Sequence, residues 1–185
     1  MSSTSTSTAT GTTTYVIDAS HSQVGFSVKH MMFSTVRGNF RGFEGTIDVD
    51  NDNPANSTVN VTIDASTVST GDEKRDEHLR SADFFDVANF PTLTFKSTSI
   101  DFKSAGDFTL NGELTIHGVA KPVQIKAEQT GEGTNPWGTD VAGFEGSTKI
   151  NRKDYGLGWN ATLEKGGVLV GEEIKITLEL EVAKR

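Results

Sequence analysis

Four histidines are the side chains best suited to acid–base or metal chemistry in this sequence, and they lie far apart along it. They are His21, His30, His78 and His117. None has another histidine within the roughly two to five residues that separate the ligands of a local zinc pair. Cysteine is absent, which excludes disulfides, thiolate metal ligands and thiol nucleophiles together. The sequence therefore predicts no local metal site, and only a site assembled from separate strands stays open.

One short segment, Asp18 to Ser22, brings together the residue types of an acyl-transfer triad. It contains an aspartate, a histidine and serines, but side chains crowded into one turn do not align as nucleophile, base and orienting acid. We interpret the segment as a capped turn. The glycine-rich nucleotide loops, the nucleophile elbow and the H-E-x-x-H zinc motif are also absent from the sequence. We therefore expect no catalytic residue and no enzyme activity.

A second polar segment, Asn151 to Gly156, gathers two cations, a phenol and an amide. It follows a stretch of alternating apolar residues that indicates a strand, so its polar groups would lie at that strand's end. Such a rim has the donors to bind a phosphate or another polar head group. An ordinary charged turn is the alternative, and the residues alone leave both open.

The elements that would hold these side chains are strands, because apolar residues alternate along most of the chain. Residues 1–14 are almost wholly Ser, Thr, Ala and Gly and are predicted to be a disordered tail. Residues 15–185 are predicted to form one domain, whose 19 glycines and 11 phenylalanines suit strands with tight bends. After a short β-like stretch at 15–18, eight strands are expected, at 24–30, 36–50, 59–63, 93–102, 108–116, 119–127, 141–150 and 174–182.

Irregular points in this pattern predict bends, a turn and one helix. The apolar parity slips near Gly42 and again before Ile100, which indicates bulges, and His117-Gly118 is predicted as a hairpin turn. A short helical segment is expected near residues 72–86, with Asp72 as its cap. An all-β chain with eight strands removes its exposed edges by closing, so we predict an eight-stranded antiparallel barrel.

The interior of such a barrel is either packed by side chains or left as a cavity, because eight strands leave room for either. Phenylalanines on the inward positions would keep the wall apolar, and glycines would leave space, as in a long narrow ligand cavity. Phenylalanines are also ordinary core residues, and glycines ordinary bends. The residue pattern leaves both interpretations open.

Charge and hydropathy limit the partners. The formal net charge is −8, and lysines and arginines form no dense cluster, so we expect no nucleic acid partner. No segment approaches the ~20 apolar residues of a membrane-spanning helix. The N-terminus lacks the basic and apolar regions of a signal peptide, which predicts a cytoplasmic protein.

Several long strings, in the order in which they occur, resemble the YceI-like family. They are YVIDASHS at 15–22, VGFSVKH at 24–30, RDEHLRSADFFD at 75–86, FPTLTF at 90–95, LTIHGVAKPV at 114–123 and NRKDYGL at 151–157. The resemblance covers about Tyr15 to Ala183 and implies an elongated, lipocalin-like barrel. It further implies that the interior binds a polyisoprenoid or an isoprenoid quinone or its precursor, as a carrier or store, with no other cofactor. Members are commonly exported and often dimeric, so a homodimer is an expectation here too, whereas the missing export signal is a departure.

Parity and the matching strings together assign residues to the ligand. The expected lining consists of Phe26, Val28, Phe40, Phe43, Phe84, Phe85, Phe95, Leu114 and Ile116. The expected head-group contacts are His21, His30, Arg152 and Tyr155. Two alternatives stay open: an enzyme that acts on such a lipid through His21, His30 or Arg152, and a stress-related interaction module whose barrel is packed.

Overall fold

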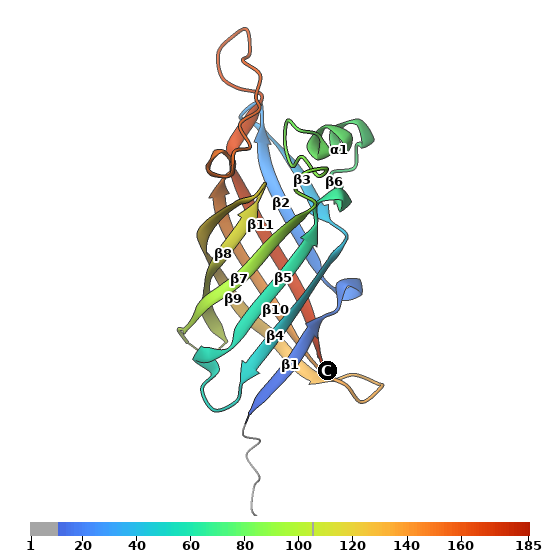
Figure 1. Cartoon of the computed structure of the whole chain (residues 1–185), viewed down its shortest axis with the longest axis vertical. Helices are drawn as coiled ribbons and strands as arrows, with labels where there is room; N and C mark the ends of the chain where they lie inside the picture. The colour runs from blue at the N-terminus through green and yellow to red at the C-terminus, as the bar shows by residue number, and fades with distance from the viewer. Residues whose placement is uncertain (1–10, 105) are drawn as a thin grey trace, which may run out of the picture.

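Antiparallel strands pair in a closed ring in the computed structural model, which describes residues 11–104 and 106–185 (Figure 1). The strands are β1 (Thr12–Ile17), β2 (Gln23–His30), β3 (Ser34–Phe40), β4 (Phe43–Asp50), β5 (Thr58–Asp64), β6 (Val68–Ser69), β7 (Thr92–Phe102), β8 (Asp107–Ile116), β9 (Val119–Thr134), β10 (Asp140–Asn151) and β11 (Val170–Lys184). Helix α1 spans Glu73–Arg80, and short 3-10 turns are η1 (Ala19–His21), η2 (Pro54–Asn56), η3 (Ala65–Thr67) and η4 (Arg152–Tyr155). The ring runs β1-β4-β5-β7-β8-β9-β10-β11 and closes through β11 and β1.

The eight-stranded prediction is confirmed, because the remaining strands extend members of this ring. β1 and β2 are two parts of one long strand, and both pair with β11. β3 and β4 are likewise two parts of the next strand, interrupted at Arg41 and Gly42, where the sequence predicts a slip. A Cβ on Gly42 would lie 2.8 Å from Cγ2 of Thr67. The bend therefore brings the backbone close to η3, which only glycine allows.

Two further local predictions are confirmed. The β7–β8 register shifts between Ser97 and Ser99, which restores the inward face before Ile100. His117 and Gly118 form the β8–β9 turn with φ of 53° and 72°, the left-handed pair that a tight two-residue hairpin requires.

Two predicted boundaries are wrong. β1 begins at Thr12, inside the segment expected to be a disordered tail, because its backbone pairs with β4 and the Thr14 hydroxyl donates to Asp48 at 2.6 Å. The rest of that predicted tail, residues 1–10, lies outside the described residues. The predicted helical segment at 72–86 is helical only over Glu73–Arg80, with Asp72 as its N-cap. The helix ends because the backbone of Ser81, its C-cap, is extended (φ −74°, ψ 173°), and turns follow.

The barrel has two different ends. Helix α1, η4 and the β2–β3 and β8–β9 turns lie at the upper end in Figure 1. The β4–β5, β7–β8 and β9–β10 connections lie at the lower end, together with the start of β1 and the C-terminus. Within the described ranges, no helix has both the length and the hydropathy to span a bilayer.

Candidate ligand-binding site

An apolar cavity occupies the barrel interior in two adjoining parts. The upper part has a volume of about 120 Å³, and its lining is aliphatic or aromatic apart from Gly25 and Thr148. The lower part has a volume of about 310 Å³. Both parts share the side chains of Val59, Leu110, Ile125, Leu178 and Leu180. The shared side chains place the two parts next to each other along the barrel axis.

The inward side chains of β11 show that this space is not filled by the protein itself. Ile176, Leu178 and Leu180 line the cavity, yet each is half-buried rather than buried. Side chains in a packed interior leave no room for a water-sized sphere. Lys175 and Glu179 alternate with these three residues and point to the outer face of the sheet. The partial exposure of the three inward side chains therefore comes from unfilled space inside the barrel.

Two inward glycines do not leave space for a ligand, which differs from the cavity interpretation of the sequence. A Cβ on Gly38 would lie 2.5 Å from Cζ of Phe26, and a Cβ on Gly112 would overlap the ring of Phe95. The space that these glycines leave is therefore taken by the rings of Phe26 and Phe95. Glycine allows the rings to lie there, and the cavity opens elsewhere along the axis.

The upper end of the cavity is closed by side chains. The rings of Phe85 and Phe40 meet edge to face with centroids 5.5 Å apart, and Tyr155 and Leu157 are 2% and 6% exposed. Leu79 of α1 packs against the same core. This arrangement leaves no open rim at η4.

The lower part of the cavity extends to the connecting loops. Its lining includes Pro54 and Ser57 between β4 and β5, and Phe102 and Gly106 around the β7–β8 turn. Phe102 is 57% exposed although it borders an apolar space. The apolar space therefore reaches the surface at the lower end.

Five predicted lining residues border the cavity: Phe26, Phe40, Phe95, Leu114 and Ile116. Each of the five lies in a stretch where the alternation is unbroken, so parity places it inward. Their contact with a ligand stays a prediction.

Four other predicted lining residues do not border either part of the cavity, and their contact with a ligand also stays a prediction. Phe85 packs on Phe40 at the upper end, and Phe84 packs against the rings of His78 and Trp159. Phe43 packs against the core next to the break between β3 and β4. Val28 sits in register between Val36 and Ile174, above the cavity. Parity alone does not say how far along the axis the space extends.

Sequence reasoning missed the residues that link the two parts of the cavity. Leu178 and Leu180 stand in the most regular alternation of the chain, and Leu110 and Ile125 alternate in β8 and β9. That signal was sufficient to place them inward. These residues are aliphatic, whereas the predicted lining is mostly aromatic.

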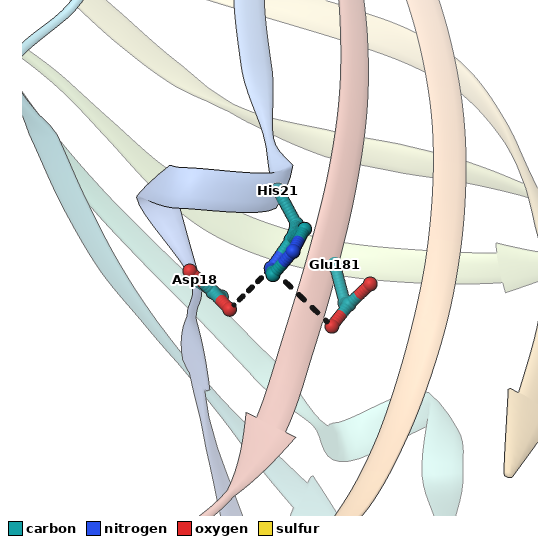
Figure 2. Close-up of side chains that lie close together, drawn as sticks. All are labelled: Asp18, His21 and Glu181. Carbon is teal, nitrogen blue, oxygen red and sulfur yellow. Dashed lines mark hydrogen bonds and ion pairs between the residues drawn. The ribbon is translucent and has the colours of Figure 1, made fainter. Parts of the chain in front are cut away.

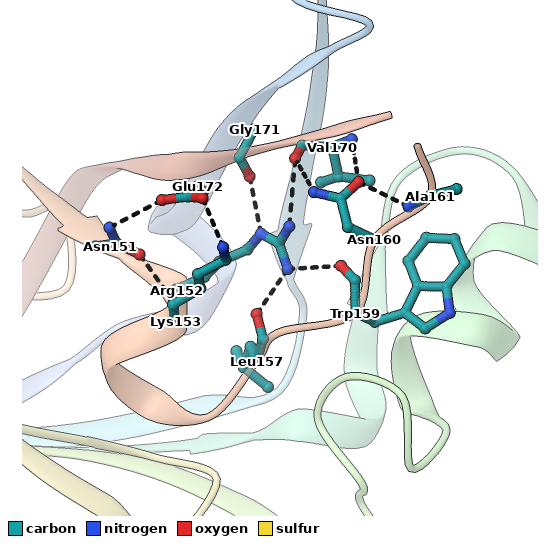
Figure 3. A network of polar contacts seen from close by, with 10 residues as sticks. All are labelled: Asn151, Arg152, Lys153, Leu157, Trp159, Asn160, Ala161, Val170, Gly171 and Glu172. Atoms are coloured by element: carbon teal, nitrogen blue, oxygen red, sulfur yellow. Dashed lines mark hydrogen bonds and ion pairs between the residues drawn. The ribbon is translucent and has the colours of Figure 1, made fainter. Parts of the chain in front are cut away.

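Arg152 is a structural residue rather than a head-group contact (Figure 3). It is 3% exposed, and its guanidinium donates to the carbonyls of Gly171 at 2.8 Å, Leu157 at 2.6 Å and Trp159 at 2.9 Å. A longer bond of 3.3 Å reaches the Val170 carbonyl. Burial lowers the pKa of Arg152 from its ordinary value, and Glu172 opposes this shift. The donors that would bind a head group are therefore occupied by the backbone.

The remaining predicted head-group contacts do not meet at the cavity entrance. Tyr155 lies at the closed upper end, where burial raises the pKa of its phenol to about 12. His30 ends β2 at the same end of the barrel, paired with Ser34. His21 lies in η1 with a side chain that is 64% exposed. Tertiary packing therefore separates residues that the sequence pattern grouped.

His21 instead forms a small cluster with two carboxylates (Figure 2). Its Nδ1 is 2.9 Å from Oδ2 of Asp18 and 3.9 Å from Oε1 of Glu181. The Ser20 hydroxyl and then His21 hold the pKa of Asp18 down at about 2. The hydrogen bond and charge of Asp18, followed by the charge of Glu181, raise the pKa of His21 above 6.5. The turn is capped as predicted, since Asp18 accepts from the backbone N–H of Ser20.

The pH dependence of this cluster follows from both shifts. The raised His21 pKa contributes stability that is present below pH 6.5 and is lost as pH rises through the folded-state pKa. The lowered Asp18 pKa contributes stability that is present above pH 3.8 and is lost as pH falls toward about 2. We expect an NMR titration of the His21 ring to give a pKa above 6.5 that falls in Asp18→Asn. An unchanged value in Asp18→Asn would contradict the pairing.

A closed eight-stranded antiparallel sheet around an apolar cavity defines a lipocalin-like barrel. The YceI-like domain model matches residues 15–182, and the chain belongs to the YceI-like family. It is 40% identical over 169 residues to Protein YceI of Salmonella newport, covering 90% of this chain and 85% of that protein.

Two solved structures resemble the fold. BcnA of Burkholderia cenocepacia shares 25% identity with a TM-score of 0.77, over 89% of this chain and 98% of that one. A domain from Saccharophagus degradans, described as a polyisoprenoid binding domain, shares 17% identity with a TM-score of 0.67, over 92% of this chain and 98% of that one. The second likeness concerns the fold alone.

Proposed function

We propose that this protein binds a long-chain apolar lipid of the polyisoprenoid or isoprenoid quinone class inside the barrel, as a carrier or store. The observation that carries the proposal is the unfilled apolar space lined by the half-buried inward side chains of β11. A neighbour described as a polyisoprenoid binding domain has the same fold. The chain's membership of the YceI-like family agrees with this assignment.

The shape of the cavity selects a narrow, flexible ligand. Its lower part, about 310 Å³, is at the small end of the ~300–1,000 Å³ typical of ligand sites, and the upper part continues it along the axis. Each buried CH₂ contributes about 0.8 kcal/mol, so a linear chain binds without many polar contacts. Polar lining occurs in the lower part, at Ser57, Gln129 and Glu145. We infer that the tail lies upward and that the polar end stays at the lower entrance.

The two alternatives have less support. A packed interaction module would leave its inward side chains buried, unlike Leu178 and Leu180. An enzyme acting through His21, His30 or Arg152 would need these groups at the head group. They lie in η1, at the end of β2 and in η4, and the Arg152 donors are already bonded to carbonyls.

Native mass spectrometry tests the proposal. Protein purified without detergent should carry a lipid whose mass is recovered in an organic extract, and protein freed of lipid should bind prenyl alcohols added in a series of lengths. We expect binding to strengthen with each added unit until the cavity is full, because apolar contact grows with length. Failure to carry or to take up any member of the series would overturn the proposal.

A further inference from the structure

Three metal-ligating side chains meet on the outer face of the barrel, apart from the lipid cavity. One donor atom each from Asp18, His21 and Glu181 lies within 4.8 Å of the others. Asp18 is the N-cap of η1 and His21 its last residue, and Glu181 lies 160 residues after His21, in β11 (Figure 2). None of the three lines either part of the cavity.

The donor separations suit a small divalent ion. Zinc bonds to nitrogen and oxygen at ~2.0–2.1 Å, so tetrahedral geometry puts its ligand atoms roughly 3.4 Å apart. The distances from Nδ1 of His21 to the two carboxylates, 2.9 Å and 3.9 Å, lie on either side of that value. Both carboxylates are partly exposed, at 34% and 39%, so small side-chain rotations equalise the distances.

Hydrogen bonds around the cluster fix the backbone that carries these ligands. The Asp18 N–H donates to the Glu181 carbonyl at 2.9 Å, and the Glu181 N–H donates to the Ser22 hydroxyl at 2.9 Å. The Ser20 hydroxyl and N–H both donate to Oδ1 of Asp18, which leaves Oδ2 turned toward His21. Partners of this kind orient metal ligands and raise affinity.

The chemistry of the donor set favours zinc over calcium or magnesium. Calcium takes six to eight oxygen ligands and magnesium prefers octahedral oxygen, whereas a histidine with two carboxylates matches the mixed nitrogen and oxygen sites of zinc. A site with three protein ligands keeps a fourth position for water. His21 is 64% exposed, so that position faces solvent.

We propose that Asp18, His21 and Glu181 form a Zn²⁺ site on the outer wall of the barrel, which joins the η1 turn to β11. Bound metal stabilises the folded chain, because the unfolded chain does not bring η1 and β11 together. The site is independent of the lipid in the interior, so lipid-free and lipid-loaded protein should bind zinc alike.

Isothermal titration of the untagged, chelator-treated full chain with zinc chloride at pH 8 tests this site. We expect one Zn²⁺ per chain, a higher melting temperature with zinc, and at least tenfold weaker binding in His21→Ala and in Glu181→Gln. His78→Ala is the matched control, because His78 also pairs with a carboxylate, Asp83 at 2.8 Å, but among the described residues it has no second carboxylate beside it as His21 has. It should bind zinc as the unaltered chain does.

Circular dichroism of the zinc-free variants separates loss of a ligand from loss of fold, and Glu181→Gln keeps the size of the side chain. Cobalt absorption gives a second readout, since a four-coordinate site gives stronger visible bands than cobalt in water. The absence of saturable zinc binding by the unaltered chain would overturn the proposal. Equal binding by folded His21→Ala and Glu181→Gln would overturn it as well.

Discussion

Replacement of Arg152 by Ala is expected to lower the free energy of unfolding by roughly 3–5 kcal/mol, the largest stability effect that we predict for one side chain. The guanidinium is buried and bonds to carbonyls of the segment from Leu157 to Gly171. A hydrogen bond to a charged group contributes about 1.5–3 kcal/mol, and buried carbonyls left without a donor add a further penalty. Urea denaturation followed by circular dichroism measures the loss.

Two variants control this experiment. Lys153→Ala removes the exposed neighbour that pairs with Glu172 at 2.7 Å, and it should cost at most about 1 kcal/mol, as exposed ion pairs do. Arg152→Lys keeps the charge but not the planar set of donors, so its stability should fall between Arg152→Ala and the unaltered chain. A head-group role would give the opposite result, with weaker lipid binding and unchanged stability.

Leu178→Trp is expected to weaken lipid binding by about thirtyfold. Leu178 lines both parts of the cavity, so a larger ring there enters the space that links them. Displacing two or three carbons of ligand costs about 2 kcal/mol at 0.8 kcal/mol per CH₂, which corresponds to that factor. Displacement of a fluorescent fatty chain by a prenyl alcohol gives the affinity.

Glu179→Trp is the matched control, because Glu179 is the next residue of β11 and points outward. It adds the same ring without entering the cavity, so binding should not change. Leu178→Ala enlarges the space and should keep binding. Retained binding in Leu178→Ala would show that the loss in Leu178→Trp comes from the larger ring and not from the loss of the leucine. Unchanged affinity in a folded Leu178→Trp would place the ligand outside the proposed cavity.

The sequence determined the strands and their inward faces. Alternation in β5, β8 and β11 needs no distant information, because side chains of any strand point to opposite faces in turn. The same local logic located the break at Gly42, the β7 bulge and the His117-Gly118 turn. Each of these features is set by residues within a few positions of one another.

The tertiary structure decided what the polar and aromatic groups do. From the sequence, Arg152 is predicted to be a cation at the rim of the cavity. In the folded chain, the segment from Leu157 to Gly171 packs around its guanidinium and supplies the carbonyls that it bonds. His21 meets Glu181 because barrel closure brings β11 beside η1. Periodicity reports the side of a strand on which a residue lies. The depth of the cavity and the partners of buried charges depend on contacts between distant segments, which alternation does not encode.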